Sequence, residues 1–168
     1  MSRKVDTFRQ QIANPQNIHN FLVDIPELGA YGITIQSTSY PSEMARVTTL
    51  HIAGEPISYP TVPENNHRWP IRIPENDSGT AYSLCEGLRK KWWDQKTGAI
   101  TVGLNNPYQD IVVYARDLNS NINFQVKLKN AWCMGRSDVQ LDQSDPSQNW
   151  KWNYMFCFDY IEDMPPAE

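Results

Sequence analysis

Near the end of the chain, large aromatic side chains occupy every second position, and this alternation constrains the fold more than any other feature. The residues are Trp150, Trp152, Tyr154, Phe156, Phe158 and Tyr160. Side chains two positions apart lie on the same face of a β-strand, so this run predicts a strand whose aromatic face packs on a core. A helix would instead need apolar residues three or four positions apart.

Other segments predict further strands and a single helix. Apolar residues alternate at 20–25, 31–35, 111–115 and 122–129, and the turn-forming residues 26–29 predict a β-hairpin from the first two. A helix is predicted over 77–94, with N-cap oxygens from 76–78 and an apolar face made of Ala81, Leu84, Cys85, Leu88 and Trp92. Trp92 and Trp93 are expected to close the helix onto the sheet. The fold class is therefore mainly β (α+β): an antiparallel β-sandwich or barrel with one flanking helix.

Residues 41–70 differ from the rest of the chain. Only 47–52 resemble a strand, and the segment contains Pro41, Pro56, Pro60, Pro63 and Pro70. Proline cannot donate to a sheet ladder, which excludes most of this segment from a central strand. Long, weakly periodic segments inside compact domains are usually functional. We therefore predict an extended, Pro-rich interaction loop at 41–70.

Length and charge limit the class of protein. The 168 residues suit a single domain over 1–168, with an N-terminal arm at 1–17 and a C-terminal tail at 163–168. No apolar run approaches the roughly 20 residues of a spanning helix, and the N-terminus has no signal-peptide core, so neither membrane insertion nor Sec export is expected. A net charge of -4 argues against nucleic-acid binding, which depends on basic surface.

No motif predicts catalysis or metal binding. Cys85, Cys133 and Cys157 are widely spaced and odd in number, so buried reduced thiols are expected, with neither disulfides nor zinc. The three histidines, His19, His51 and His67, have no partner at metal-ligand spacing. A Cys–His pair that meets only in space is the weaker alternative. We expect no enzyme activity, no cofactor and no metal.

The six tryptophans allow two interpretations. They could form an exposed platform for sugars or for single-stranded nucleic acid. Core packing is favoured, because Trp150 and Trp152 continue the alternation of the last strand. A carbohydrate-binding β-sandwich is kept as the alternative from a different functional class.

The order of these elements resembles a known family. An Asn-Phe-x-Val-x-Ile strand at 20–25 precedes a second strand, the Pro-rich loop and a helix ending near Trp92 and Trp93. The segment 112–117, the strand 124–128 with Asn-Ala-Trp at 130–132, and a closing strand at 156–162 follow. From about residue 17 to residue 162 the chain is similar to the tail tube proteins of contractile-tailed bacteriophages. Their fold resembles that of bacteriocin and type VI secretion tube proteins. Residues 133–135 and 142–149 depart from the family pattern.

The resemblance implies a non-enzymatic structural virion protein. Six copies would form a ring with a continuous inner barrel, and stacked rings would form the inner tube of the tail, a conduit that passes genomic DNA into the host without binding it. The implied partners are further copies of the chain, the tail sheath, baseplate and tail-terminator proteins, and a tape measure protein inside the tube. The implied location is the virion tail, assembled in the host cytoplasm. A tail-completion or baseplate tube-like protein is the alternative within the same fold.

Two sets of residues are the expected sites. Ring closure removes unpaired sheet edges, and the loop is the expected supplier of the subunit interface, through Pro41, Val47, Leu50, Ile52, Pro56, Tyr59, Pro63 and Trp69. The lumen is expected to include Asp24, Thr34 and Asp110, because negative charge repels phosphates. The chain ends carry opposite charges, which favours stacking in one direction, with two solvated tails as the alternative. The charged residues are Arg3, Lys4 and Arg9 near one end and Asp159, Glu162, Asp163 and Glu168 near the other.

Overall fold

The computed structural model describes residues 21–41, 44–64, 66–103, 105–116, 121–139 and 149–165. These residues form a mainly β, antiparallel structure, which confirms the predicted fold class. The strands are β1 (Phe21–Asp24), β2 (Ser37–Thr38), β3 (Met44–Ile52), β4 (Glu55–Glu64), β5 (Arg68–Pro74), β6 (Gln109–Arg116), β7 (Ile122–Arg136), β8 (Lys151–Cys157) and β9 (Tyr160–Met164). The described helices are the 3-10 helix η1 (Gly29–Thr34) and the α-helix α2 (Thr80–Lys90).

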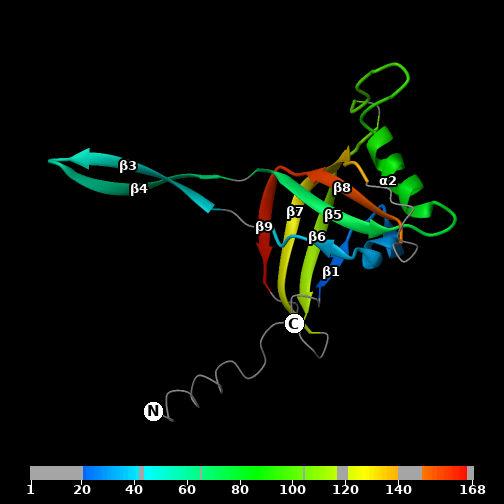
Figure 1. Cartoon of the computed structure of the whole chain (residues 1–168), viewed down its shortest axis with the longest axis horizontal. Helices are drawn as coiled ribbons and strands as arrows, with labels where there is room; N and C mark the ends of the chain where they lie inside the picture. Colours follow the sequence, from blue (N-terminus) through cyan, green and yellow to red (C-terminus); the bar gives the residue numbers. More distant parts are fainter. Residues whose placement is uncertain are drawn as a thin grey trace, which may run out of the picture.

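The long strand β7 organises the sheet (Figure 1). Its first half pairs with β6 on one side and β9 on the other, and β1 pairs with β6. Its second half pairs with β8, which continues to β5 and β2. Between the two halves, Asn130 has a positive φ of 54°, and the β6–β7 register shifts between Gln109 and Ile111. This irregularity lets one strand serve two differently directed groups of strands.

The core is formed by buried side chains of both groups of strands, of the segments flanking η1 and of α2. Tyr154, Phe156 and Phe158 of the aromatic run are buried, and Phe156 meets Trp69 edge-on, with ring centroids 6.2 Å apart. The ends of the run differ from the prediction: Trp150 is 44% exposed and Tyr160 is 52% exposed. The predicted strand is divided, because β8 ends at Cys157 and the chain turns to pair β9 with a different part of β7.

The helix is shorter than predicted and begins later, at Thr80. Residues 76–78 precede it, and Gly79 is the N-cap residue, with a positive φ of 69° and no side-chain cap. Asn76 Oδ1 accepts from the Thr80 amide, but the amides of Ala81 and Tyr82 donate to the Glu75 carboxylate. Ala81, Cys85 and Leu88 are buried, which confirms the predicted apolar face.

The hairpin predicted from 20–25 and 31–35 is wrong. The chain turns after Ile25, whose carbonyl accepts from the Leu28 and Gly29 amides, and then forms η1 against β1. A Cβ at Gly32 would lie 2.9 Å from the Val23 carbonyl oxygen, so this close packing depends on glycine. The partner of β1 is β6, which is far away in the sequence.

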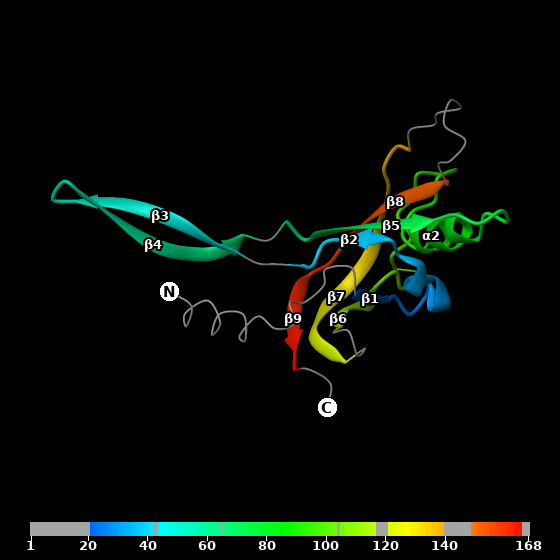
Figure 2. The same cartoon turned by 60° about the horizontal axis from the view of Figure 1, so that its bottom comes forward.

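Residues 41–70 contain more strand than predicted. β3 and β4 form a two-stranded antiparallel hairpin that projects far from the rest of the sheet (Figures 1 and 2). Three prolines lie inside β4, a strand that was not predicted; the prediction that prolines keep this segment out of a central strand is consistent with the hairpin, which forms its own two-stranded sheet. A two-stranded ribbon has a free edge on each strand, and edge strands tolerate proline.

Candidate interaction surfaces

The projecting hairpin has a tight two-residue turn. Ala53 and Gly54 join β3 to β4 and have positive φ values of 52° and 87°. Positive φ at both central positions matches the twist of antiparallel strands, which makes such turns the favoured hairpin connection. Every side chain that the structure describes from Met44 to Val62 is exposed.

One face of the hairpin is apolar. Leu50 lies opposite Ile57, Thr48 opposite Tyr59, and Ile52 opposite Glu55. The exposed fractions are 51% for Leu50, 51% for Ile52, 39% for Ile57 and 44% for Tyr59. The contacts of β3 and β4 are essentially with each other. Isolated two-stranded hairpins are at best marginally stable in water, so this face has the character of a docking surface.

The residues predicted for the interface fall into three groups. Val47, Leu50, Ile52, Pro56 and Tyr59 lie exposed on the hairpin, and Pro41 is half-buried just before it. Pro63 lies in β4 opposite Ala45. Trp69 belongs to the core: it is 1% exposed, and its indole donates to the Ser39 carbonyl at 2.8 Å. Its side chain has almost no surface left for a neighbour, so the interface proposed below does not include it.

A second surface is the face of the β1–β6–β7–β9 sheet turned away from the core. Ile111 and Val113 of β6 point into the core, so Asp110 and Val112 point to the other side. Asp24 is opposite Val112 and lies on that same side, whereas Thr34 is exposed in η1, off the sheet. Two of the three residues predicted for the lumen therefore share one sheet face.

The charge of Asp110 is matched locally. Its carboxylate accepts from the Lys129 ammonium and from the Asn130 amide at 3.2 Å. The hydrogen bond from Lys129 is the main cause that holds the pKa of Asp110 below its usual value. The carboxylate thus stays ionised while its field is reduced by a cation on the neighbouring strand.

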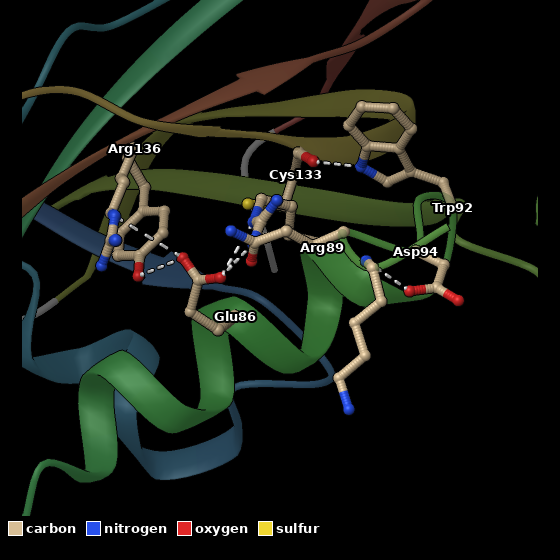
Figure 3. Close-up of polar contacts among 9 residues, drawn as sticks. Glu86, Arg89, Trp92, Asp94, Cys133 and Arg136 are labelled. Atoms are coloured by element: carbon tan, nitrogen blue, oxygen red, sulfur yellow. Dashed lines mark hydrogen bonds and ion pairs between the residues drawn. The ribbon is translucent and has the colours of Figure 1, made fainter. Parts of the chain in front are cut away.

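A polar cluster joins α2 to the sheet (Figure 3). Glu86 is 5% exposed, and its Oε2 accepts from Arg89 Nη2 at 2.6 Å and from Arg89 Nε at 2.9 Å. Arg136 Nε lies 3.9 Å from Glu86 Oε1, and its guanidinium lies over Tyr82, 5.0 Å from the ring centroid. A buried carboxylate held by arginine ties the helix in place.

The same region contains the buried thiols and a buried tyrosine. Burial is the main cause that raises the pKa of Cys133 to about 12, and it also raises the pKa of Cys85. Burial likewise raises the pKa of Tyr154, which stays protonated and donates to Glu86 Oε1 at 3.4 Å. The three cysteines are free, as predicted, and Cys157 is half-buried. In the described ranges, no three His, Cys, Asp or Glu side chains gather closely enough to hold a metal ion.

The tryptophans do not form a broad exposed platform. All six lie in the described part of the chain, and only Trp150 is exposed. Trp92 donates from its indole nitrogen to the Cys133 carbonyl at 2.7 Å and meets Trp132 edge-on, with ring centroids 5.1 Å apart. This confirms that Trp92 closes the helix onto the sheet. No helix within the described residues is long and apolar enough to cross a membrane.

The sequence matches no protein-family model and no curated protein. Solved structures with the same fold do exist. A chain from the PVC sheath–tube complex, an extracellular contractile injection system in its extended state, is 12% identical, with a TM-score of 0.64. That alignment covers 94% of this chain and 97% of the other. A chain from the tube-terminating cap of the anti-feeding prophage is 13% identical, with a TM-score of 0.64 and coverage of 91% and 92%.

A third similar chain comes from the baseplate of the anti-feeding prophage. It is 16% identical, with a TM-score of 0.64, and the alignment covers 89% of this chain and 95% of that one. At these identities the comparison shows the fold alone, and that fold is the one implied by the resemblance seen in the sequence. The chain has the tail-tube fold of contractile injection systems.

Proposed function

We propose that this chain is a non-enzymatic subunit of a contractile tail, and that it forms hexameric rings that stack into the inner tail tube. The shared fold supports a role as a tube component. The observation that carries the proposal is the apolar hairpin of β3 and β4, whose face stays exposed to solvent in the described part of the chain. Packing this face on a neighbouring copy would stabilise both the hairpin and the assembly.

The sheet edges offer a second set of contacts. In the described part of the chain, β1 pairs only with β6 and β9 pairs only with β7, so these two strands form opposite edges of one antiparallel sheet. Open edges are a hazard for an isolated subunit. A head-to-tail contact between β1 of one copy and β9 of the next would remove both edges and close a ring.

In such a ring, the face opposite the core would be continuous and would line the lumen. Asp24 and Asp110 lie on that face, together with Lys127, Lys129 and Glu162, as the pairing across β1, β6, β7 and β9 shows. Thr34 lies outside this sheet, near its margin. Arg116, two positions beyond Tyr114 on β6, adds a third cation to this face. Three carboxylates balance three cations, so the face has no net positive charge that would hold DNA.

Reversing charge on this face tests the lumen assignment. Phage carrying Asp24→Lys and Glu162→Lys should eject DNA more slowly at low ionic strength, where charges are least screened. An ejection rate unchanged at every salt concentration would contradict the assignment.

The proposal includes the partners of a contractile tail. These are the sheath around the tube, the baseplate and terminator at its ends, and a tape measure protein inside, with the virion tail as the location. Sheath, terminator and baseplate are named in the structures of similar fold. Asp159, Glu162 and Asp163 near the C-terminus would contribute the negative end of each ring. The N-terminal arm, with Arg3, Lys4 and Arg9, lies outside the described residues.

Electron microscopy of the purified protein tests the proposal directly. The full chain should polymerise alone into uniform hollow cylinders, and a variant in which a Gly-Ser linker replaces residues 44–64 should stay unassembled. Because none of the described side chains of the hairpin belongs to the core, far-UV circular dichroism and thermal unfolding should show that this variant is folded. If the full chain stays monomeric at high concentration, or if the shortened variant still forms tubes, the assembly role of the hairpin is wrong.

A minor tube-like component is the second candidate. Chains from a sheath/tube terminator and from a tube-terminating cap share the fold, which favours this alternative. A terminator or baseplate component would form single rings, whereas a major tube protein would form long cylinders. The same micrographs separate the two.

A further inference from the structure

The hydrogen-bond pattern of the hairpin follows from its turn. A two-residue turn places Ile52 and Glu55 as the closing, hydrogen-bonded pair. Antiparallel pairs alternate between hydrogen-bonded and non-hydrogen-bonded, so Leu50–Ile57 and Thr48–Tyr59 are also hydrogen-bonded pairs. The intervening pairs are His51–Pro56, Thr49–Ser58 and Val47–Pro60. In these pairs the backbone nitrogen of each residue points away from the partner strand, towards a free edge of the hairpin.

The prolines of β4 all occupy outward-facing positions. Pro56 lies opposite His51 and Pro60 opposite Val47, which are both pairs of the outward-facing class. Beyond Pro60, β4 has one extra residue, and Pro63 is opposite Ala45. Ala45 is two positions from Val47 and therefore also has an outward-facing backbone nitrogen. Because of the extra residue in β4, its partner is Pro63, which is outward-facing as well. The Thr61 hydroxyl donates to the Arg46 carbonyl at 2.8 Å beside this irregularity.

The two edges of the hairpin therefore differ. Between the turn and the irregularity, β4 has only the Ser58 N–H on its free edge, because proline has none at positions 56 and 60. On β3, the N–H groups of Val47, Thr49 and His51 all face outward. A free edge can pair with a strand of another molecule, and proline in an edge strand is a known means of preventing such pairing.

We propose that the hairpin binds a second copy of this chain by strand pairing through the β3 edge only, and that the prolines close the β4 edge against the same pairing. The proposal rests on the self-assembly proposed above and adds which edge of the hairpin contacts the neighbouring copy. The occupant is an extended segment of a second copy. The apolar face formed by Leu50, Ile57 and Tyr59 needs cover from the same neighbour. Among the described strands, β1 and β9 each have one unpaired edge on every copy. With one open edge, each hairpin accepts one neighbour, which prevents unlimited edge-to-edge growth.

Thr49 and Ser58 provide a matched pair of variants because they lie directly opposite each other. Thr49→Pro removes an outward N–H from the open edge and leaves the ladder between β3 and β4 intact. Ser58→Pro makes the same change on the edge that already lacks its neighbouring donors. Both side chains are exposed and neither belongs to the core, so the two substitutions should affect the fold of the subunit to a similar extent.

Thr49→Pro should raise the concentration needed for assembly about tenfold or more. Each subunit would lose one intersubunit hydrogen bond, and the proline side chain would crowd the edge that pairs. Ser58→Pro should assemble like the unmodified chain. Sedimentation of the polymer over a concentration series measures both. Equal assembly of Thr49→Pro and the unmodified chain would overturn the proposal, as would an equal loss in Ser58→Pro.

Amide hydrogen exchange gives an independent measurement on the unmodified protein. The amides of Val47, Thr49 and His51 should exchange quickly in the monomer and at least a hundredfold more slowly in the assembled state, since pairing would engage them. Unchanged exchange at these three amides in assembled tubes would refute the edge assignment while leaving the tube function standing. Failure of the unmodified chain to assemble at all would refute both.

Discussion

The carboxylate of Glu75 is the main N-terminal cap of α2, although it lies well before the helix. Its Oε1 accepts from the amides of Asn76 at 2.9 Å and Ala81 at 3.0 Å. Its Oε2 accepts from the Tyr82 amide at 2.8 Å and from the Trp152 indole at 2.7 Å. A single side chain thus fixes the start of the helix and joins it to β8. We expect Glu75→Gln to be markedly destabilising.

The magnitude follows from these four hydrogen bonds. A glutamine has one oxygen and one NH2 group, so it can accept from one pair of donors but must point its own donors at the other pair. Two accepted bonds are lost, and at this partly exposed position each contributes about 1 kcal/mol. The free energy of unfolding should fall by about 2 kcal/mol, which for a chain of this size lowers Tm by about 4–8 °C.

The effect should depend on pH in a defined direction. Burial raises the pKa of Glu75, but the hydrogen bonds from Tyr82, Asn76, Trp152 and Ala81 outweigh it and bring the pKa below the ordinary value of 4.5. A lowered folded-state pKa means that the carboxylate stabilises the fold at pH values above 4.5 and loses this contribution as the pH falls through the folded pKa. The gap in Tm between the unmodified chain and Glu75→Gln should therefore be largest near pH 7 and should narrow in acid.

Asp77→Asn is the control. Asp77 is an exposed carboxylate in the same turn, so its replacement changes the net charge and the helix-dipole interaction without removing a cap. Thermal unfolding followed by tryptophan fluorescence, at a concentration where one oligomeric state is present, measures both variants. Equal Tm values for the two variants, or a gap for Glu75→Gln that stays constant from pH 7 to pH 3, would refute the reasoning.

Two further predictions concern packing and thiol reactivity. Gly32→Ala should lower the free energy of unfolding by about 1–3 kcal/mol, because the new methyl group would lie 2.9 Å from the Val23 carbonyl oxygen. Gly87→Ala in α2, where the new methyl group has no neighbour within 4 Å, should instead raise the free energy of unfolding by about 0.5–1 kcal/mol. Urea unfolding measures both variants, and equal midpoints would contradict this account. In the native protein a disulfide reagent should modify Cys157 alone and reach Cys85 and Cys133 only after unfolding, since burial raises both their pKa values and the reactive species is the thiolate. Rapid reaction of two or more thiols in the folded chain would show that the core around α2 opens readily.

The hairpin shows why sequence reasoning reached the right segment but the wrong structure. Five prolines in 41–70 marked it as unlike the core strands, and the prediction of an exposed extended segment followed. The β4 strand was missed because proline normally argues against a strand. Its pairing became visible only with the register, which places Pro56 and Pro60 at outward-facing positions where no ladder bond is lost. The Ala53–Gly54 turn between two stretches of similar length was the signal that could have found it.

Periodicity by itself determined what is local in this protein: strand alternation at 154–158, the buried face of α2, and a mainly β fold with one flanking helix. Only the tertiary structure decided the partner of each strand and the environment of each side chain. It buried Trp69, exposed Trp150, turned 29–34 into a 3-10 helix and gave the helix its cap at Glu75. The physical reason is the range of the interactions. Alternation of apolar residues defines the two faces of one strand or helix, whereas burial and strand pairing depend on contacts between residues far apart in the chain.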